Sequence, residues 1–160
     1  MSLRSVKPLI VILGPTASGK SAVGLELARR IDSEIICADS RTVYRHMNIG
    51  TAKPSTEEQA GIRHWCLDLV NPDQAFSVAD FKRDAERAIA DIRSRGKYPI
   101  MVGGSGLYID SVIFDFQLQP KADPKLRQSL EQLTTEQLQQ YCKKHNYSLP
   151  ENSTNRRHLI

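Results

Sequence analysis

Three short apolar runs are the most regular feature of the chain, and each gives way to glycine or polar residues. They cover residues 9–13, 34–38 and 99–102, and they are rich in isoleucine and valine. Apolar runs of this length are typical of strands that a parallel sheet buries on both faces. The sequence therefore predicts three buried strands.

Hydrophobic residues between these runs recur every three or four positions, which is the spacing of one helix face. The spacing predicts helices over residues 20–31 and from Ser77 to Gly96, and another helical run begins at Leu107. Ser77, followed by Asp80 at the third helical position, has the pattern of an N-terminal cap. Because strands and helices alternate, we expect an α/β fold, with a parallel sheet flanked by helices on both faces.

Residues 42–73 interrupt this alternation. Glycine and proline recur among them, and we expect a long excursion from the sheet with one short strand near residues 65–69. An irregular segment of this length in a compact domain is usually functional.

The final part of the chain is rich in Gln, Lys and Glu. Asp123 and Pro124 predict a helix start, as a cap and a first-turn proline, and residues 135–145 repeat the helical pattern. We expect an incomplete α/β core over residues 1–118 and the start of a helical insertion over residues 119–160. The end of the chain is apolar and lacks a capping residue, so we expect the protein to continue beyond it.

Composition limits the classes of protein to consider. With 40% hydrophobic and 25% charged residues the chain matches ordinary globular proteins, and disordered or collagen-like proteins are excluded. The longest apolar run is far shorter than the ~20 residues of a membrane span, so we expect a cytoplasmic protein without a membrane partner. Three cysteines without a paired spacing favour free thiols. The net charge of +4 allows an anionic partner without requiring one.

Residues 14–21 match the phosphate-binding pattern G-x-x-x-x-G-K-[ST], and they lie between a predicted strand and a predicted helix, as that pattern requires. In such a loop, successive backbone N–H groups converge on an anion at the positive end of the helix. Lys20 would contact terminal phosphate oxygens, and the Ser21 hydroxyl would complete the shell of a Mg²⁺ ion. The predicted phosphate-binding residues are Gly14, Pro15, Thr16, Ala17, Ser18, Gly19, Lys20 and Ser21.

Asp39 directly follows the second apolar run. The carboxyl ends of neighbouring parallel strands face one crevice, so we expect Asp39 and Arg41 near the bound phosphates. A carboxylate there could ligate magnesium, cap the following turn or accept a proton from an attacking nucleophile. Position alone does not choose among these roles.

Several longer stretches share a further likeness. They are residues 14–21, then 39–41 with 43–45 and 49–54, then 76–81, and then 95–97 with 102–108. In these residues the chain resembles the N-terminal half of the isopentenyl-tRNA transferase family, the tRNA dimethylallyltransferases. The resemblance implies a P-loop NTPase-like fold. It also implies transfer of a dimethylallyl group from dimethylallyl diphosphate to N6 of the adenine next to the anticodon, position 37 of the tRNA.

The resemblance further implies roles for individual residues. The phosphate loop would hold the diphosphate of the donor with Mg²⁺, Lys20 and Thr16 would lie at the reacting centre, and Asp39 would be the general base for the adenine amine. The target base would be flipped out of the anticodon loop of the tRNA. Contacts to tRNA are implied for Asp39, Ser40, Arg41, Thr42, Ser105 and Arg127.

Some residues depart from the family pattern. Thr42 stands where glutamine is common, and its side chain is shorter. Ser21 and Ser105 replace threonine but keep the hydroxyl. Trp65 could stack on a base, although a lone tryptophan beside Leu67 more often belongs to the core.

Other functions stay open at this point. A related transferase, adenylate isopentenyltransferase, prenylates free adenosine nucleotides; it shares the loop and the aspartate, and the helical part of this chain favours tRNA instead. A small nucleotide kinase is disfavoured because no cluster of lid arginines is visible. A third alternative is a module that binds diphosphate or RNA without turnover, because members of the family are longer. We expect a monomer, with weak or absent activity from these 160 residues alone.

The positions of the basic residues bear on the RNA partner. Arg41, Arg45 and Lys53 fall near the predicted mouth of the site, and further Lys and Arg residues lie in the helical part. Together they favour a stripe that faces RNA, with a solvated basic surface as the alternative.

Overall fold

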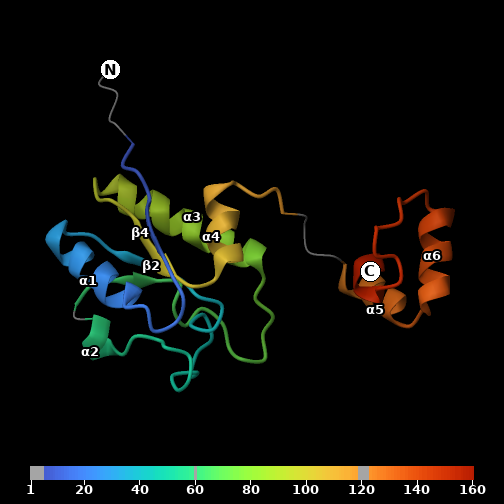
Figure 1. Cartoon of the computed structure of the whole chain (residues 1–160), viewed down its shortest axis with the longest axis horizontal. Helices are drawn as coiled ribbons and strands as arrows, with labels where there is room; N and C mark the ends of the chain where they lie inside the picture. Colours follow the sequence, from blue (N-terminus) through green and yellow to red (C-terminus); the bar gives the residue numbers. More distant parts are fainter. Residues whose placement is uncertain (1–5, 60, 119–122) are drawn as a thin grey trace. The chain divides into compact units, whose positions relative to one another are not determined.

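The computed structural model describes residues 6–59, 61–118 and 123–160 (Figure 1). The chain divides into two compact units, Met1–Gln117 and Leu118–Ile160. The expected boundary near residue 119 falls at positions 119–122, which lie outside the described residues. Among the described residues, no helix is long and apolar enough to cross a membrane.

The first unit is built on a four-stranded parallel sheet in the order β1-β4-β2-β3. Its strands are β1 (Ile10–Leu13), β2 (Ile35–Ala38), β3 (His64–Trp65) and β4 (Ile100–Gly103). Helix α1 (Lys20–Arg30) joins β1 to β2, and α3 (Val78–Ser94) leads into β4. The predicted α/β architecture with a parallel sheet is therefore confirmed.

Helices cover both faces of the sheet, which explains the apolar runs. On one face, Ile35 and Val102 belong to the cluster that α1 covers. On the other face, Ile36 and Met101 lie in a larger cluster with α3 and α4 (Gly106–Ile113). Figure 1 shows α1 on one side of β2 and β4, with α3 and α4 on the other. Successive residues of a strand therefore face different helices, and both sets must be apolar.

Strand β1 is less buried than its sequence predicts. Ile10, Val11 and Ile12 are half-buried, and Leu13 is 57% exposed. Within the described residues, β1 pairs with β4 alone, so one of its edges has no neighbouring strand. The residues after Leu13, which form the predicted phosphate loop, thus leave from an edge strand.

The excursion after β2 contains more regular structure than predicted. A short helix, α2 (Thr56–Gln59), lies where the sequence pattern indicated only irregular chain. The strand expected near residues 65–69 is instead β3, which begins at His64 and is only two residues long. Tyr44 and Val70 add one isolated parallel bridge. These short elements rest on contacts between distant residues, which local periodicity does not reveal.

Helix α3 begins and ends where the sequence predicts. The Asp80 backbone N–H donates to Ser77 Oγ (3.3 Å), and the Ser77 backbone N–H donates to the Asp80 carboxylate (3.1 Å). After the helix, Gly96 has a φ of +76°, in the left-handed region that glycine adopts without strain. Helix α3 is tied to α4 by Phe81, whose ring stacks on Tyr108 with centroids 4.3 Å apart.

The second unit is helical. It contains α5 (Pro124–Glu131), α6 (Thr135–Lys144) and α7 (Arg156–Leu159). The Asp123 carboxylate accepts a hydrogen bond from the backbone N–H of Lys125 (2.9 Å), so the predicted helix start is confirmed. Leu138 and Cys142 of α6 are buried. A hydrogen bond from Arg156 to the carbonyl of Glu131 (2.8 Å) links α7 to the end of α5.

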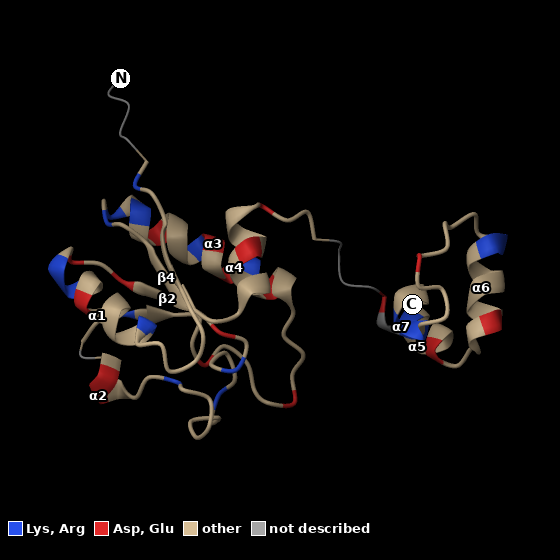
Figure 2. Ribbon diagram, viewed as in Figure 1, with Lys and Arg blue, Asp and Glu red and all other residues tan. Residues whose placement is uncertain are grey.

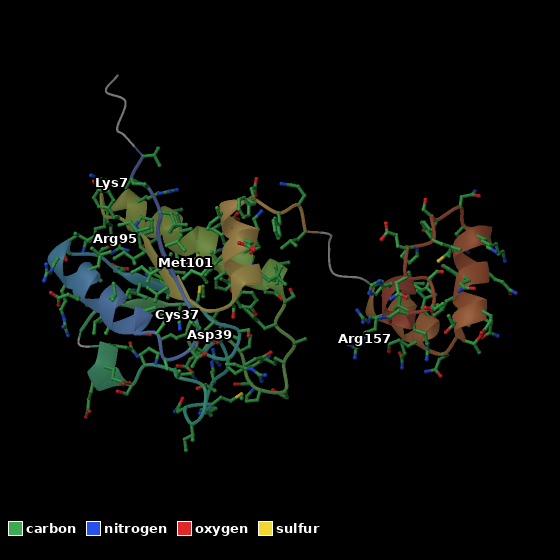
Figure 3. All side chains as sticks on the ribbon, in the orientation of Figure 1. Lys7, Cys37, Asp39, Arg95, Met101 and Arg157 are labelled. Carbon is green, nitrogen blue, oxygen red and sulfur yellow. The ribbon has the colours of Figure 1, made fainter. Side chains whose placement is uncertain are left out.

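An ion pair between Glu34 and Arg95 lies at the amino ends of the strands. The buried Glu34 carboxylate accepts hydrogen bonds from Trp65 Nε1 (2.7 Å) and Arg95 Nη2 (3.0 Å). The hydrogen bond from Arg95 lowers the pKa of Glu34, and the same contact raises the pKa of Arg95. The Arg63 guanidinium lies 3.7 Å from the centroid of the Trp65 ring. Trp65 therefore has a structural role. Figure 3 shows that Arg95, in this ion pair, and Asp39 lie at opposite ends of the sheet.

The Gly103→Ala variant should be strongly destabilised. A Cβ at Gly103 would lie 2.0 Å from the carbonyl oxygen of Ala38, so β2 and β4 would have to separate. We expect urea denaturation to show a free energy of unfolding lower by about 3 kcal/mol or more. Gly106→Ala is the matched control, because a Cβ there meets nothing within 4 Å. Equal stability of the two variants would contradict this account of the β2–β4 contact.

The Glu34→Gln variant should lose about 1–2 kcal/mol of stability at pH 7, because it removes the charge that Arg95 pairs with. The pKa of Glu34 in the folded chain is below its ordinary value of 4.5. The wild-type advantage is therefore complete above that value and is lost as the pH falls through the folded pKa. Urea denaturation of both proteins at pH 7 and pH 3 tests this. A stability difference that does not shrink in acid would show that the charge is not its cause.

Candidate functional site

The loop that follows β1 has the shape of an anion cradle. It leads into α1 through Gly19, whose φ is +81°, and Ala17 also has a positive φ of 64°. Gly19 occupies the N-cap position, no side chain caps the helix, and no acidic residue lies in its first turn. The positive end of α1 and its free N–H groups are therefore open to an anion. The predicted phosphate loop thus lies between β1 and the N-terminus of α1, and phosphate binding by this loop stays a prediction.

Lys20 lies across this loop. Its ammonium group donates a hydrogen bond to the carbonyl oxygen of Pro15 (2.9 Å). Gly104, just after β4, comes close to both parts of the loop. A Cβ at Gly104 would lie 3.3 Å from the Gly14 carbonyl oxygen and 3.9 Å from Lys20 Nζ. The absence of a side chain at Gly104 leaves room for Lys20 to turn toward a bound phosphate.

Ser21 is suited to hold a Mg²⁺ ion beside such a phosphate. It lies in the first turn of α1, next to Lys20, and its side chain is exposed. No cluster of three His, Cys, Asp or Glu residues able to hold a metal is found in the described part of the chain. Mg²⁺ often keeps several waters and binds through substrate phosphates. One hydroxyl beside a phosphate cradle fits this mode of binding.

Asp39 caps the turn that follows β2. Its Oδ1 accepts a hydrogen bond from the Arg41 backbone N–H (2.9 Å), and its carbonyl oxygen accepts one from Thr42 Oγ1 (3.2 Å). Within the described residues, Asp39 Oδ2 has no hydrogen-bond partner. The capping role considered at the outset is therefore present, and it leaves one carboxylate oxygen available to a substrate.

Ser105 joins this turn to the end of β4. The Ser40 backbone N–H donates to Ser105 Oγ (3.0 Å), and the Ser105 backbone N–H donates to the Ala38 carbonyl (3.1 Å). The Ser105 hydroxyl thus holds the turn that carries Asp39. Contact of Ser105 with tRNA stays a prediction.

A cavity of about 720 Å³ connects the phosphate loop with Asp39. Its apolar floor includes Ile35, Cys37 and Val102 of the sheet. Burial raises the pKa of the Cys37 thiol, so Cys37 stays protonated and contributes packing. The predicted site residues that line the cavity are Thr16, Ala17, Ser18, Gly19, Lys20, Ser21, Asp39 and Thr42. Asp39 lies just beyond Cys37 at the end of β2 in Figure 3.

The predicted residues that do not line the cavity are Gly14, Pro15, Ser40, Arg41, Ser105 and Arg127. Ser40 and Arg41 are part of the Asp39 turn, and both side chains are exposed. Thr42 is buried, with its hydroxyl bonded within the turn. Arg127 is on α5 of the second unit, where it pairs with Glu131 (3.0 Å). Contact of these residues with tRNA stays a prediction.

Lys53 does not belong to an exposed basic stripe, in contrast to the expectation from the sequence. Its side chain is only 5% exposed, and its ammonium group pairs with Asp68 (2.7 Å). It also donates to the Tyr44 carbonyl (2.6 Å) and to Asn48 Oδ1 (3.2 Å). Lys53 is therefore an internal anchor of the excursion and not an exposed cation. No local pattern in the sequence reveals this role, because Tyr44 and Asp68 lie nine and fifteen positions from Lys53.

Comparison with known proteins places the chain in a family. The sequence model for IPP transferase matches residues 42–158. A tRNA dimethylallyltransferase of Staphylococcus aureus is 49% identical over 141 residues, which cover 83% of this chain and 45% of that protein. The chain thus spans about half the length of the curated relatives that it matches.

Solved structures agree with the sequence matches. The full-length tRNA isopentenylpyrophosphate transferase of Bacillus halodurans has a TM-score of 0.68 at 37% identity, with 96% of this chain and 53% of that one covered. The Staphylococcus epidermidis tRNA isopentenylpyrophosphate transferase has a TM-score of 0.67 at 42% identity, covering 96% and 52%. A eukaryotic dimethylallyltransferase acting on tRNA has a TM-score of 0.75 at 29% identity, covering 96% and 40%.

The family match extends from the turn after Asp39 through both units, and the Staphylococcus aureus relative shares 49% of the aligned residues. The resemblance inferred from the motifs is confirmed: this chain belongs to the IPP transferase family.

Proposed function

We propose that the whole protein transfers a dimethylallyl group from dimethylallyl diphosphate to N6 of adenine 37 in tRNA, and that this chain supplies the phosphate loop and the base. The observation that carries the proposal is that the phosphate loop and the Asp39 carboxylate line one cavity. The names of the relatives, tRNA dimethylallyltransferase and tRNA isopentenylpyrophosphate transferase, indicate the substrates. Because the chain spans about half the length of those relatives, the activity of the whole protein is part of the proposal.

The phosphate loop acts on the donor. The free N–H groups at the start of α1 and the Lys20 ammonium would bind the diphosphate. As the bond between C1 and the diphosphate oxygen breaks, negative charge grows on the diphosphate and the allylic carbon becomes cationic. Donors already aimed at the diphosphate stabilise that charge without reorganising. The Ser21 hydroxyl would hold Mg²⁺, which supplies further positive charge to the leaving group.

Asp39 acts on the acceptor. N6 of the adenine forms a bond to C1 of the donor, and the proton released from N6 passes to the Asp39 carboxylate. The Oδ2 atom of Asp39 suits this role, because Oδ1 already accepts the Arg41 N–H. Thr16 lines the same cavity and would contact the reacting groups from the loop side. The products are the N6-dimethylallyl adenine and free diphosphate.

The acceptor RNA would approach from the turn after β2. Ser40 and Arg41 expose their side chains there, and they are the proposed tRNA contacts of the first unit, together with Thr42 and Ser105. Arg127, on a helix of the second unit, is a further proposed contact. The apolar floor of the cavity excludes water from the reacting carbon, which limits hydrolysis of the donor.

The Asp39→Asn variant should lose prenyl transfer and keep donor binding. Asparagine can still accept the Arg41 N–H through its side-chain oxygen, so the turn is retained, but the amide cannot take the proton from N6. We expect the single-turnover rate to fall about 10²- to 10⁴-fold. The rate is measured with the whole protein in excess over labelled dimethylallyl diphosphate, in the presence of Mg²⁺ and an anticodon stem-loop.

An exposed aspartate provides the control for this variant. Asp73→Asn makes the same chemical change at an exposed position that does not line the cavity, and it should transfer at the wild-type rate. A wild-type rate in Asp39→Asn would contradict the assignment of the base. Transfer to free adenosine nucleotide alone would contradict the assignment of tRNA as the acceptor.

Removal of the Ser21 hydroxyl should raise the Mg²⁺ concentration that diphosphate binding requires. Ser21→Ala should need about tenfold more Mg²⁺ to bind diphosphate, since one inner ligand is lost. Ser21→Thr keeps the hydroxyl and should behave as the wild type. Calorimetric titration of diphosphate at several Mg²⁺ concentrations measures both variants. Identical magnesium requirements in the alanine and threonine variants would show that Ser21 is not a ligand.

A further inference from the structure

A tip of residues 46–51 carries Ile49 into solvent. Ile49 is 96% exposed, the highest value among the large hydrophobic side chains in the described part of the chain. Figure 1 shows the segment between β2 and α2 as an open loop outside the sheet and its helices. An isoleucine exposed to this degree gains nothing from burial in the fold. A partner that covered Ile49 would recover that contribution.

Polar contacts hold the base of this tip. Thr51 Oγ1 donates to the Met47 carbonyl (2.7 Å), and Lys53 Nζ donates to Asn48 Oδ1 (3.2 Å). Lys53 is itself buried and paired with Asp68 (2.7 Å). Charge-assisted hydrogen bonds of this kind are stronger than neutral ones. The tip is therefore held in place before any partner arrives, and little ordering is needed when one binds.

The charges on the same segment favour a polyanion. Asp39 is the only acidic residue between positions 39 and 54, whereas three residues there are Lys or Arg. Lys53 is buried, but Arg41 and Arg45 are exposed. Arg45 Nε donates to the Asp68 carbonyl oxygen (2.8 Å), and among the residues that the structure describes no carboxylate pairs with either arginine. Figure 2 shows blue, basic positions along this loop.

An apolar side chain on a loop whose exposed arginines pair with no carboxylate, within the described residues, matches the chemistry of a single-stranded nucleic acid. Such a strand presents flat apolar base faces together with phosphates. A protein partner would also offer carboxylates to the arginines, but the loop that carries them begins and ends at the cavity, which Thr42 and Ala52 line. Ala52 and Lys53, at the base of the tip, line the cavity wall. Tip and cavity thus belong to one continuous stretch of chain.

We propose that Ile49 covers the face of an unstacked base in the acceptor RNA, next to the adenine that enters the cavity. Arg41 and Arg45 contact the phosphates on either side of that base. This inference rests on the proposed function, since it takes RNA as the acceptor. It adds a contact that recognises the RNA loop through apolar surface, in addition to contacts with phosphates.

Binding of a labelled anticodon stem-loop, followed by fluorescence anisotropy with Mg²⁺ and diphosphate present, tests the contact. Ile49→Ser should weaken binding of the stem-loop about five- to tenfold and leave the affinity for diphosphate unchanged. Ile113→Ser is the matched control, because Ile113 is a 47% exposed isoleucine at the end of α4. The control should bind the RNA as the wild type does. Wild-type RNA affinity in Ile49→Ser would overturn the inference.

Abasic stem-loops identify the base. Each base flanking the target adenine is replaced in turn by an abasic nucleotide. At the base that Ile49 covers, the abasic RNA should bind the wild type more weakly but should lose no further affinity for Ile49→Ser. Losses that are additive at every position would overturn the inference.

The same experiments separate this inference from the proposed function. If the wild type transfers the prenyl group, Asp39→Asn does not, and Ile49→Ser binds RNA normally, the Ile49 contact alone is wrong. If the wild type neither binds nor prenylates the stem-loop, both the contact and the tRNA acceptor are wrong.

Discussion

The close approach of β4 to β2 at Gly103 is the constraint on which the site depends. No side chain fits there, because a Cβ would lie 2.0 Å from the Ala38 carbonyl oxygen. Gly104, the next residue, lies close to the phosphate loop: a Cβ there would be 3.3 Å from the Gly14 carbonyl oxygen. The ends of three parallel strands therefore meet with only backbone between them. As a result, the phosphate loop after β1 and the Asp39 turn after β2 open into one cavity.

The two ends of the strands have different roles: the polar groups at the amino ends stabilise the fold, and those at the carboxyl ends are placed for chemistry. At the amino ends of the strands, the Glu34 carboxylate is buried and accepts hydrogen bonds from Arg95 and Trp65. At the carboxyl ends of the strands, the polar groups keep some hydrogen-bonding capacity. Lys20 donates to a carbonyl of its own loop, and Asp39 accepts a hydrogen bond within its turn through one carboxylate oxygen. Groups held in this way keep their positions and can still exchange a partner for substrate. In residues 42–73, beside the site, the buried Lys53 side chain pairs with Asp68 and stabilises this segment.

Features encoded by neighbouring residues could be predicted from the sequence. The apolar runs predicted the three four-residue strands, Ser77 and Asp80 predicted the start of α3, and the loop motif predicted the turn between β1 and α1. Features that rest on distant partners could not. The four residues of α2 have no hydrophobic periodicity, and the edge position of β1 depends on which strands join the sheet.

The same division holds within the site. The position of Asp39 at the end of a strand was predictable, because the strand and its polar end are adjacent in sequence. The bond from the Ser40 N–H to Ser105 Oγ joins residues 65 positions apart, and no local pattern reveals it. The burial of Lys53 was likewise hidden, since its charge alone suggested an exposed cation. Sequence thus identified the chemical groups, while the structure showed which of them are held by the protein itself.

Identification of the product is the most direct test of the central claim that the phosphate loop and Asp39 serve one transfer reaction. The whole protein is incubated with dimethylallyl diphosphate, Mg²⁺ and an anticodon stem-loop. The RNA is digested and analysed by mass spectrometry, and the released diphosphate is measured. The account predicts one N6-dimethylallyl adenine for each diphosphate released. Diphosphate released without modified adenine, or modification only of free nucleotide, would contradict it.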